Sequence, residues 1–258
     1  MTGMALHLFG YDLRAFARNR QSRFFTLALP VLFLVIFASV FGGRGNTTPV
    51  AGGRISTSVY YVPGIMALGI IAACFGNLVA SVTAQRERGV LKRRRATPVP
   101  AAAVIAGRVL TAVVIAVVMA AVLLGIGWAA YGAHVPGRTV LALAVTVVTG
   151  AVCFCCLGYA LTSLIRNEDA ALPTTQALLL PLYFISGVFV AVTVLPHWLA
   201  DVGEIFPVRH LADALRLAYD PHTTGLGFAG LDLLIVAAWG AAGLLIALRT
   251  FSWLPLGR

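Results

Sequence analysis

The sequence predicts an all-α integral membrane protein with six transmembrane helices, an N-terminal interfacial amphipathic helix and an extracellular re-entrant helical hairpin between spans five and six. Of its 258 residues, 60% are hydrophobic and 11% are charged, whereas soluble domains carry about 25% charged residues. Mean hydropathy is +0.92, and apolar runs of about 20 residues, the length that crosses a bilayer, follow one another along the chain. Lipid therefore surrounds most of the surface, and residues 1–258 form a single transmembrane domain.

Residues 4–22 are predicted to lie in the membrane interface rather than to cross it. Apolar side chains recur there at spacings of three and four and form one stripe of a helix, and arginines lie off that stripe. The stripe consists of Leu6, Phe9, Leu13 and Phe16, and the arginines are Arg14, Arg18 and Arg20. A frayed N-terminal tail is the alternative.

Six apolar runs are the expected spans: 24–41, 59–84, 101–131, 139–165, 170–192 and 226–248. The first is too long for a signal-peptide core, so we expect no cleavable signal peptide. Residues 42–58 form a loop too short to be a domain. Four cysteines fall inside apolar runs, which favours packing roles over a metal or redox site and predicts no disulfide framework: Cys74, Cys153, Cys155 and Cys156.

The basic residues predict the topology. With the N-terminus inside, five of the 19 Lys and Arg residues fall outside, namely Arg44, Arg54, Arg138, Arg209 and Arg216, and the other 14 fall inside. This asymmetry predicts a multi-pass protein of a bacterial plasma (inner) membrane with both termini cytoplasmic. It also explains the net charge of +10 without nucleic acid as a partner. The basic residues from Lys92 to Arg95 are expected to face anionic lipid.

Catalytic motifs are missing from the sequence. It contains neither a phosphate-binding GxxxxGK[ST] loop nor HExxH. An intramembrane serine protease needs an embedded histidine beside a serine such as Ser186, but every histidine falls in a loop or tail. Secondary transporters and channels normally keep ionisable groups at mid-membrane, whereas Arg108 and Asp232 stand near span ends, where snorkelling explains them. Asn77 is the one strongly polar side chain in mid-span, and we expect it to make an interhelical hydrogen bond.

Residues 194–222 read as two short amphipathic helices that dip into the outer leaflet. Five charges exclude a full span, because each would cost about 2.5–3.5 kcal/mol at the bilayer centre: Asp201, Glu204, Arg209, Asp213 and Arg216. Apolar residues at helical spacing disfavour a plain loop, and Pro196 and Pro207 stand where a first helical turn tolerates proline. We expect the apolar faces of both helices to lie toward lipid and the fifth span.

Two segments together resemble a known family. The first is Glu87-Arg88-Gly89-Val90-Leu91 within a loop of residues 85–100, and the second runs from Phe184 through Leu195-Pro196-His197-Trp198 and Phe206-Pro207 to Arg216. Over essentially the whole chain they resemble the membrane subunits of ABC type-2 exporters, particularly the daunorubicin-resistance-like drug efflux permeases. Val90 departs from that pattern, since such permeases often have threonine there, and we expect little consequence.

The resemblance implies a machine of two permeases, either two copies or this chain with a paralogue, and two separate ATPase subunits. ATP and magnesium would be bound by the ATPases, and this chain would bind no cofactor and catalyse nothing. The loop of residues 85–100 would act as the coupling element against the ATPase, through Arg86, Glu87, Arg88, Gly89 and Leu91. The alternative for Glu87 is a simple pair with a neighbouring arginine.

A pathway for the cargo is expected to be apolar, because the spans supply almost no charge. Its candidate lining comes from spans one, two and five: Phe33, Phe37, Phe75, Asn77, Tyr183, Phe184 and Phe189. The hairpin would form an extracellular gate of Pro196, Trp198, Phe206 and Pro207, with a static lid as the alternative. The expected cargo is a hydrophobic, drug-like or antibiotic-like small molecule. The alternatives are a lipid, glycolipid or polysaccharide intermediate as cargo, or a membrane scaffold that transports nothing.

Overall fold

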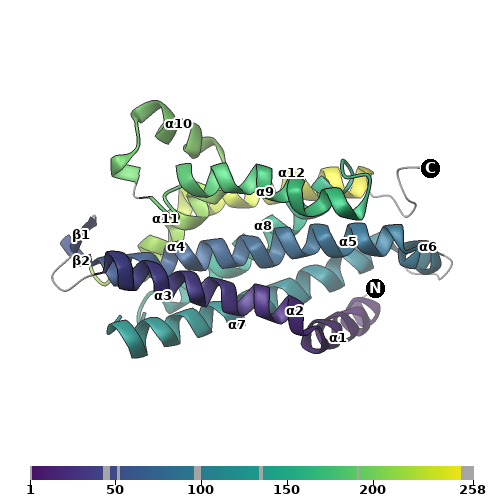
Figure 1. The fold of residues 1–258 in the computed structure, drawn as a ribbon, viewed down its shortest axis with the longest axis horizontal. Coiled ribbons are helices and arrows are strands. Elements are labelled where there is room, and N and C mark those ends of the chain that lie inside the picture. Colours follow the sequence, from purple (N-terminus) through teal and green to yellow (C-terminus); the bar gives the residue numbers. More distant parts are fainter. Residues whose placement is uncertain are drawn as a thin grey trace.

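A computed structural model describes residues 2–42, 47–50, 53–95, 100–133, 136–190 and 192–250. Residues 96–99 of the expected coupling loop and the last eight residues of the chain lie outside this range. Long helices lie along the long axis of the molecule and form one bundle (Figure 1). In order along the chain, the helices of the bundle are α3 (Leu29–Phe41), α4 (Thr57–Ile71), α5 (Asn77–Glu87), α7 (Ala101–Tyr131), α8 (Val140–Thr162), α9 (Glu168–Ile185) and α12 (Gly230–Thr250).

A single long helix lies at the centre of the bundle. It comprises α4, the π-helical turn η2 (Ala72–Gly76) and α5, and together these segments pack against α3, α7, α8 and α9. Its fully buried side chains include Ile65, Met66 and Ile70. Because this helix is apolar on all sides and surrounded by others, it fixes the relative positions of the remaining spans.

Four helices in the described part of the chain are long and apolar enough to cross a membrane: Val59–Glu87, Ala102–Tyr131, Val140–Thr162 and Gly230–Thr250. They correspond to the second, third, fourth and sixth expected spans. The other two expected spans contain the shorter apolar helix Thr26–Phe41 and the 18-residue α9. The chain is thus an all-α multi-pass membrane protein.

Small residues bring α8 and α12 into close contact. A Cβ atom added at Gly243 would lie 2.9 Å from the backbone nitrogen of Leu157, and one added at Gly240 would lie 3.1 Å from the Cα of Cys153. Without hydrophobic driving force in lipid, such backbone approach is what joins helices. All four cysteines are free and buried, which confirms the prediction of packing residues without disulfides.

The N-terminal segment forms an amphipathic helix, as predicted. Helix α1 (Thr2–Arg18) packs against α7, with Leu13 and Phe16 partly buried and Arg14 and Arg18 exposed. The short helix α2 (Arg20–Arg23) and the π-helical turn η1 (Phe24–Ala28) then lead into α3. The chain therefore changes direction between Arg18 and Phe24 while remaining helical.

Two predicted loop or helix boundaries were wrong. The segment expected as a loop of residues 42–58 contains an antiparallel hairpin of β1 (Thr47–Val50) and β2 (Gly53–Ser56), in which Thr47 pairs with Ser56. The fifth span was expected to reach residue 192, but α9 ends at Ile185. Gly187 adopts a φ of +77°, which favours glycine and turns the chain away from the helix axis.

The outer hairpin forms two helices, as predicted, but they are not equivalent. Helix α10 (His197–Ile205) projects from the bundle, whereas α11 (Pro207–Tyr219) packs against α4, α8 and α12 (Figure 1). The expectation that both apolar faces lie toward lipid and the fifth span is therefore wrong for α11. Its apolar face is buried in the bundle because Gly150 of α8 leaves room for the Leu211 side chain.

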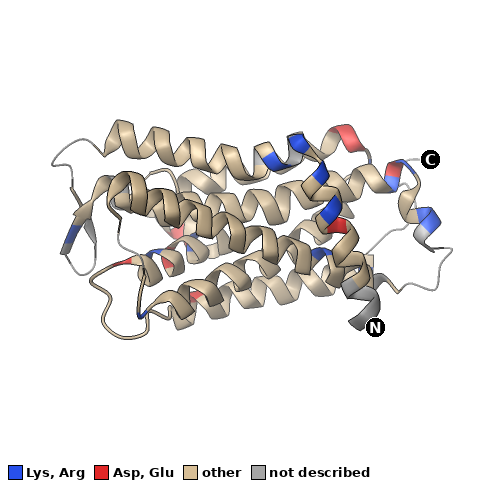
Figure 2. Cartoon of the chain, turned by 90° about the horizontal axis from the view of Figure 1, so that it is seen from below, with Lys and Arg blue, Asp and Glu red and all other residues tan. Residues whose placement is uncertain are grey.

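Charged residues gather toward one end of the bundle. Figure 2 shows many of the Lys and Arg residues toward the end where α1 begins and α12 finishes, with a smaller mixed group toward the opposite end. This distribution follows the asymmetry read from the sequence.

Candidate translocation cavity and cytoplasmic loop

The largest apolar cavity lies between α3, the central helix and α9. Its volume is about 610 Å³, within the range of small-molecule sites. Four of the seven predicted pathway residues line it: Phe33, Asn77, Tyr183 and Phe189. The remaining lining is Asn19, Leu29, Leu68, Ala72, Gly76, Ala80, Leu172, Thr175, Gln176, Leu179 and Leu180.

Phe189 is the centre of an aromatic cluster at this cavity. Its ring stacks on Phe37 at 5.4 Å between centroids and meets Phe33 edge-on at 6.0 Å. Tyr183 and Phe184 approach the same ring at 5.9 and 5.4 Å. Phe37 and Phe184 thus support the wall without being part of the cavity lining. Aromatic packing of this kind gives a rigid apolar wall.

Phe75 was predicted to line the pathway, but it lies outside the cavity. It is buried in the core, and its backbone lies beside Gly158 of α8. On the central helix, Ala72, Gly76 and Ala80 face the cavity, and a residue one position away points about 100° aside because a helical turn takes 3.6 residues. The aromatic character of Phe75 indicated a site, whereas its helical phase places it in the core.

Asn77 makes the interhelical hydrogen bond that was predicted. Its amide nitrogen donates to the Thr26 hydroxyl at 2.6 Å. Thr26 lies within the π-helical turn η1, and Asn77 directly follows the π-helical turn η2. Such turns are rare and occur often at functional sites. The bond therefore links two irregular turns on neighbouring helices beside the cavity.

Sequence reasoning missed the polar residues of α9. Thr175 and Gln176 line the cavity, and the buried Thr175 Oγ1 has no hydrogen-bond partner among the described residues. Only the helical spacing of Leu172, Thr175, Gln176 and Leu179 could have indicated this face. Together with Asn77, these side chains supply isolated polar contacts in an otherwise apolar space.

At the cytoplasmic loop, Arg86 is buried and clamps the end of α8. Its guanidinium donates to the Thr162 carbonyl oxygen at 2.7 Å and also to the Ile165 carbonyl oxygen. Carbonyl groups at a helix C-terminus lack partners within the helix and carry partial negative charge, so a cation satisfies both needs. Leu91 is also buried. These two residues attach the loop to the bundle.

Glu87 and Arg88 contact the start of α9 from the surface. The Glu87 carboxylate accepts a hydrogen bond from the backbone nitrogen of Glu168 at 2.6 Å, and Arg88 forms an ion pair with the Glu168 carboxylate at 2.7 Å. Gly89 then turns the chain with a φ of +71° into α6 (Val90–Arg95). We call Arg86, Glu87 and Arg88, with their partners from Thr162 to Glu168, the loop clasp. The printed partner of Glu87 is a helix N-terminus rather than an arginine.

The predicted gate residues divide between exposed and buried positions. Trp198 is 67% exposed and Pro196 is exposed, whereas Pro207 is buried at the first turn of α11. Phe206 stacks on Trp239 of α12, and the Trp239 indole donates to the Ile205 carbonyl oxygen at 3.1 Å. The hairpin is therefore fixed at its corner and open along α10.

Polar contacts fix α11 to its neighbours. His210 forms a contact of 2.7 Å from Nδ1 to the Asp232 carboxylate at the start of α12, and its Nε2 donates to the Glu204 carbonyl oxygen. Asp232 therefore pairs within the protein and does not only snorkel. Arg216 pairs with Asp213 at 2.7 Å and also donates to the Gly187 carbonyl oxygen, which connects α11 to the end of α9.

Tyr219 ends α11 as a buried, neutral phenol. Burial raises the pKa of its hydroxyl to about 12. The hydroxyl would lie 3.7 Å from a Cβ atom added at Gly127 of α7. The last turn of α11 is thus packed into the bundle rather than placed at its surface.

Comparison with known proteins gives consistent matches. The profile of a family described as ABC-2 type transporter matches residues 6–219. The "Daunorubicin resistance ABC transporter permease protein DrrB1" of Streptomyces coeruleorubidus is 27% identical over 86% of this chain and 77% of its own. The "Inner membrane transport permease YadH" of Escherichia coli K12 is 23% identical over 83% of this chain and 85% of its own.

One relative is considerably longer than the matched region. The "Probable multidrug ABC transporter permease YbhR" of Escherichia coli K12 is 25% identical over 70% of this chain. That alignment covers 47% of YbhR, so the chain spans about half the length of this relative.

Proposed function

The chain belongs to the ABC-2 type transporter family, and from this premise we propose that it is the permease subunit of an ATP-driven exporter of hydrophobic small molecules. The cavity between α3, the central helix and α9 supports this proposal most directly. Its lining contains no charged side chain among the described residues, and aromatic rings form one wall. A site of this character binds apolar molecules and orients them with few polar groups.

Energy would come from partner subunits. Two ABC ATPases, each with ATP and magnesium, would dock at the cytoplasmic loop, and a second copy or a paralogue of this permease would complete the pathway. The loop clasp supports this role, because it joins the surface-exposed Glu87 and Arg88 to the ends of α8 and α9. A push on this loop would reach both helices at once.

The cavity can be tested by transport in inverted membrane vesicles that contain the chain with its co-encoded ATPase. The hydrophobic dye Hoechst 33342 should be taken up with ATP, and a hydrophobic competitor should reduce this uptake. Phe189→Ala should lower uptake several-fold, because it removes the centre of the aromatic wall. Trp128→Ala is the matched control, since Trp128 is an exposed aromatic residue of α7.

Uptake that saturates with a hydrophilic charged solute and ignores hydrophobic competitors would exclude the proposed cargo class. ATP-independent uptake would exclude the ATPase partner. Selective transport of a labelled lipid would move the assignment to the lipid exporters.

The hairpin would act as the extracellular gate. Helix α10 supports this role because Trp198, Val202 and Ile205 leave an apolar face exposed, while α11 is anchored in the bundle. Cysteine at Ala200 should cross-link the α10 helices of two permease copies, and the cross-link should stop export while ATP binding persists. Cysteine at Ala214, which is fully buried, is the control and should not cross-link. Unimpaired export with complete cross-linking would leave α10 as a static lid.

A further inference from the structure

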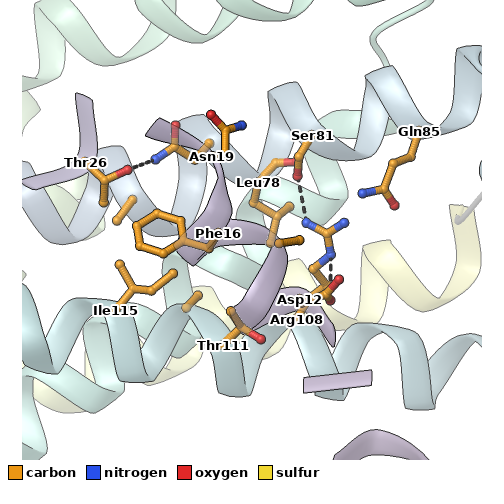
Figure 3. A pocket seen from close by; sticks show the side chains of 14 residues that line it. Asp12, Phe16, Asn19, Thr26, Leu78, Ser81, Gln85, Arg108, Thr111 and Ile115 are labelled. Carbon is orange, nitrogen blue, oxygen red and sulfur yellow. Dashed lines mark hydrogen bonds and ion pairs between the residues drawn. The ribbon is translucent and has the colours of Figure 1, made fainter. Parts of the chain in front are cut away.

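A second pocket lies between α1, α5 and α7 and has a different chemistry from the cavity (Figure 3). Its volume is about 230 Å³. Asn19 and Asn77 line both spaces, so the Thr26–Asn77 hydrogen bond lies at the boundary between them. The other residues that line the pocket are Asp12, Ala15, Phe16, Ala73, Leu78, Ser81, Gln85, Arg108, Thr111, Ala112 and Ile115.

An ion pair between α1 and α7 forms the charged end of this pocket. Arg108 Nε lies 3.1 Å from the Asp12 carboxylate, and Arg108 Nη1 donates to the Ser81 hydroxyl at 2.9 Å (Figure 3). The two charged side chains are 15% and 12% exposed, so each keeps an accessible surface. The expectation that Arg108 snorkels to the membrane surface is therefore wrong, because its guanidinium is bonded within the bundle.

Both partners of this ion pair retain unused hydrogen-bonding capacity. Among the described residues, Arg108 Nη2 and Asp12 Oδ1 have no hydrogen-bond partner. The Gln85 side chain lies beside the guanidinium (Figure 3). One available donor with positive charge thus lies next to one available acceptor with negative charge. A simple anion would be repelled by Asp12 and a simple cation by Arg108, whereas a ligand with both charges would satisfy both.

The depth of the pocket matches a lipid headgroup. Arg108 stands seven residues after Ala101, where α7 begins, so it lies about 10 Å along the helix at 1.5 Å per residue. The amphipathic α1, expected in the inner membrane interface, forms the adjacent wall. Phe16, Leu78 and Ile115 provide apolar contacts beside the charged end. This combination suits the junction between a headgroup and its acyl chains.

We propose that this pocket binds the zwitterionic headgroup of an inner-leaflet phospholipid, with the phosphate on Arg108 and Gln85 and the ammonium on Asp12. The lipid would be a resident of the permease and not its cargo. It would join α1 to α5 and α7 through both of its charges. The position of α1 would then depend on the headgroups available in the inner leaflet.

Native mass spectrometry of the purified chain tests this proposal with three lipids that carry the same two oleoyl chains. The probes are phosphatidylethanolamine, phosphatidylglycerol and diacylglycerol. Phosphatidylethanolamine should bind about tenfold or more tightly than diacylglycerol, because its headgroup adds charge-assisted hydrogen bonds. Phosphatidylglycerol should bind less well than phosphatidylethanolamine, since it lacks the ammonium group.

Two substitutions separate a lipid site from a simple helix-fastening ion pair. Arg108→Gln should reduce both phospholipids to the level of diacylglycerol. Asp12→Asn should reverse the preference toward phosphatidylglycerol, because it removes the ammonium partner and the repulsion of anions. Arg249→Gln, at the last turn of α12, removes one basic charge elsewhere and should preserve the wild-type order.

Equal binding of all three lipids by the wild-type chain would overturn the proposal, and this arm needs no variant to fold. An unchanged preference in a folded Asp12→Asn variant would also overturn it. The thermal midpoint of the wild-type chain gives an independent reading, since phosphatidylethanolamine should raise it more than phosphatidylglycerol does.

Discussion

At the scale of single residues, Asn77 shows both what the sequence can predict and where prediction stops. Its position in mid-span predicted an interhelical hydrogen bond, since an amide in hydrocarbon needs a partner. The structure supplies Thr26 as that partner. The sequence could not select it among the threonines, because the choice depends on the register of two π-helical turns, which no local pattern marks.

The same limit applies to charged residues near span ends. Snorkelling explained Arg108 and Asp232 from the sequence alone, but Arg108 pairs with Asp12 and Asp232 pairs with His210. Each partner belongs to a helix distant in sequence. Only the assembled bundle shows that these charges are satisfied internally.

Glu87 can be tested for a coupling role at this scale. Glu87→Ala removes the acceptor for the Glu168 backbone nitrogen, so the loop clasp loses its contact with the N-terminus of α9. We expect transport to fall several-fold while ATP hydrolysis by the partner subunit persists or assembly weakens. The measurement is ATP-driven uptake and ATP hydrolysis on the same vesicles.

Asp169→Ala is the matched control for Glu87. Asp169 is an exposed acidic residue in the same first turn of α9 and has no hydrogen bond to the loop among the described residues. Normal transport and normal assembly in Glu87→Ala would leave that carboxylate with a local role only. The Arg88–Glu168 pair is more exposed and contributes at most about 1 kcal/mol to stability.

At the scale of elements, the sequence predicted the existence of helices better than their ends and neighbours. Apolar length predicted the spans, and proline positions and spacing predicted α10 and α11. The burial of α11 was missed because its charged residues suggested a surface helix. Their pairing with one another and with Gly187 allows the opposite face to enter the core. The β-hairpin of residues 47–56 was missed because its strands are only four residues each.

The α8–α12 interface gives a stability prediction. Gly243→Ala would place a Cβ atom 2.9 Å from the Leu157 nitrogen, so one helix backbone has to move. We expect a loss of about 1–3 kcal/mol in the free energy of unfolding, as for other overpacked sites. Thermal denaturation in detergent measures the change.

Gly125→Ala is the corresponding control in the middle of α7. A Cβ atom there would meet nothing within 4 Å, so the better helix propensity of alanine should leave stability unchanged or raise it by up to about 1 kcal/mol. An equal loss of stability in both variants would show that helix propensity, rather than contact with α8, determines the effect.

At the scale of the whole molecule, charge rather than shape carries the orientation. Four helices qualify as spans by length and composition, and two shorter ones complete the six that the sequence predicts. With six crossings, Thr223 after the outer hairpin and Arg249 at the end of α12 fall on opposite sides. The family was predictable because its motifs occur at ordered positions along the chain, whereas the cavity and the lipid pocket depend on packing.

Single cysteine reporters test this topology in a background without the four native cysteines. Cysteine at Thr223 should react with a membrane-impermeant maleimide on intact cells, and cysteine at Arg249 should react only after permeabilisation. The 14-to-five distribution of basic residues is the physical reason. Reaction of both reporters, or of neither, on intact cells would show an odd number of crossings between these positions to be wrong.

The π-helical turn before Asn77 has a consequence for the history of the chain. Such a turn holds one residue more than the α-helical turn that it replaces. Removing one residue from positions 72–76 would restore an ordinary helix and rotate everything beyond it by about 100°. Asn77 and the loop at Glu87 would then face new directions together. The interior surface of the cavity and the outer surface offered to a partner are thus set by a single phase, and selection on either one constrains the other.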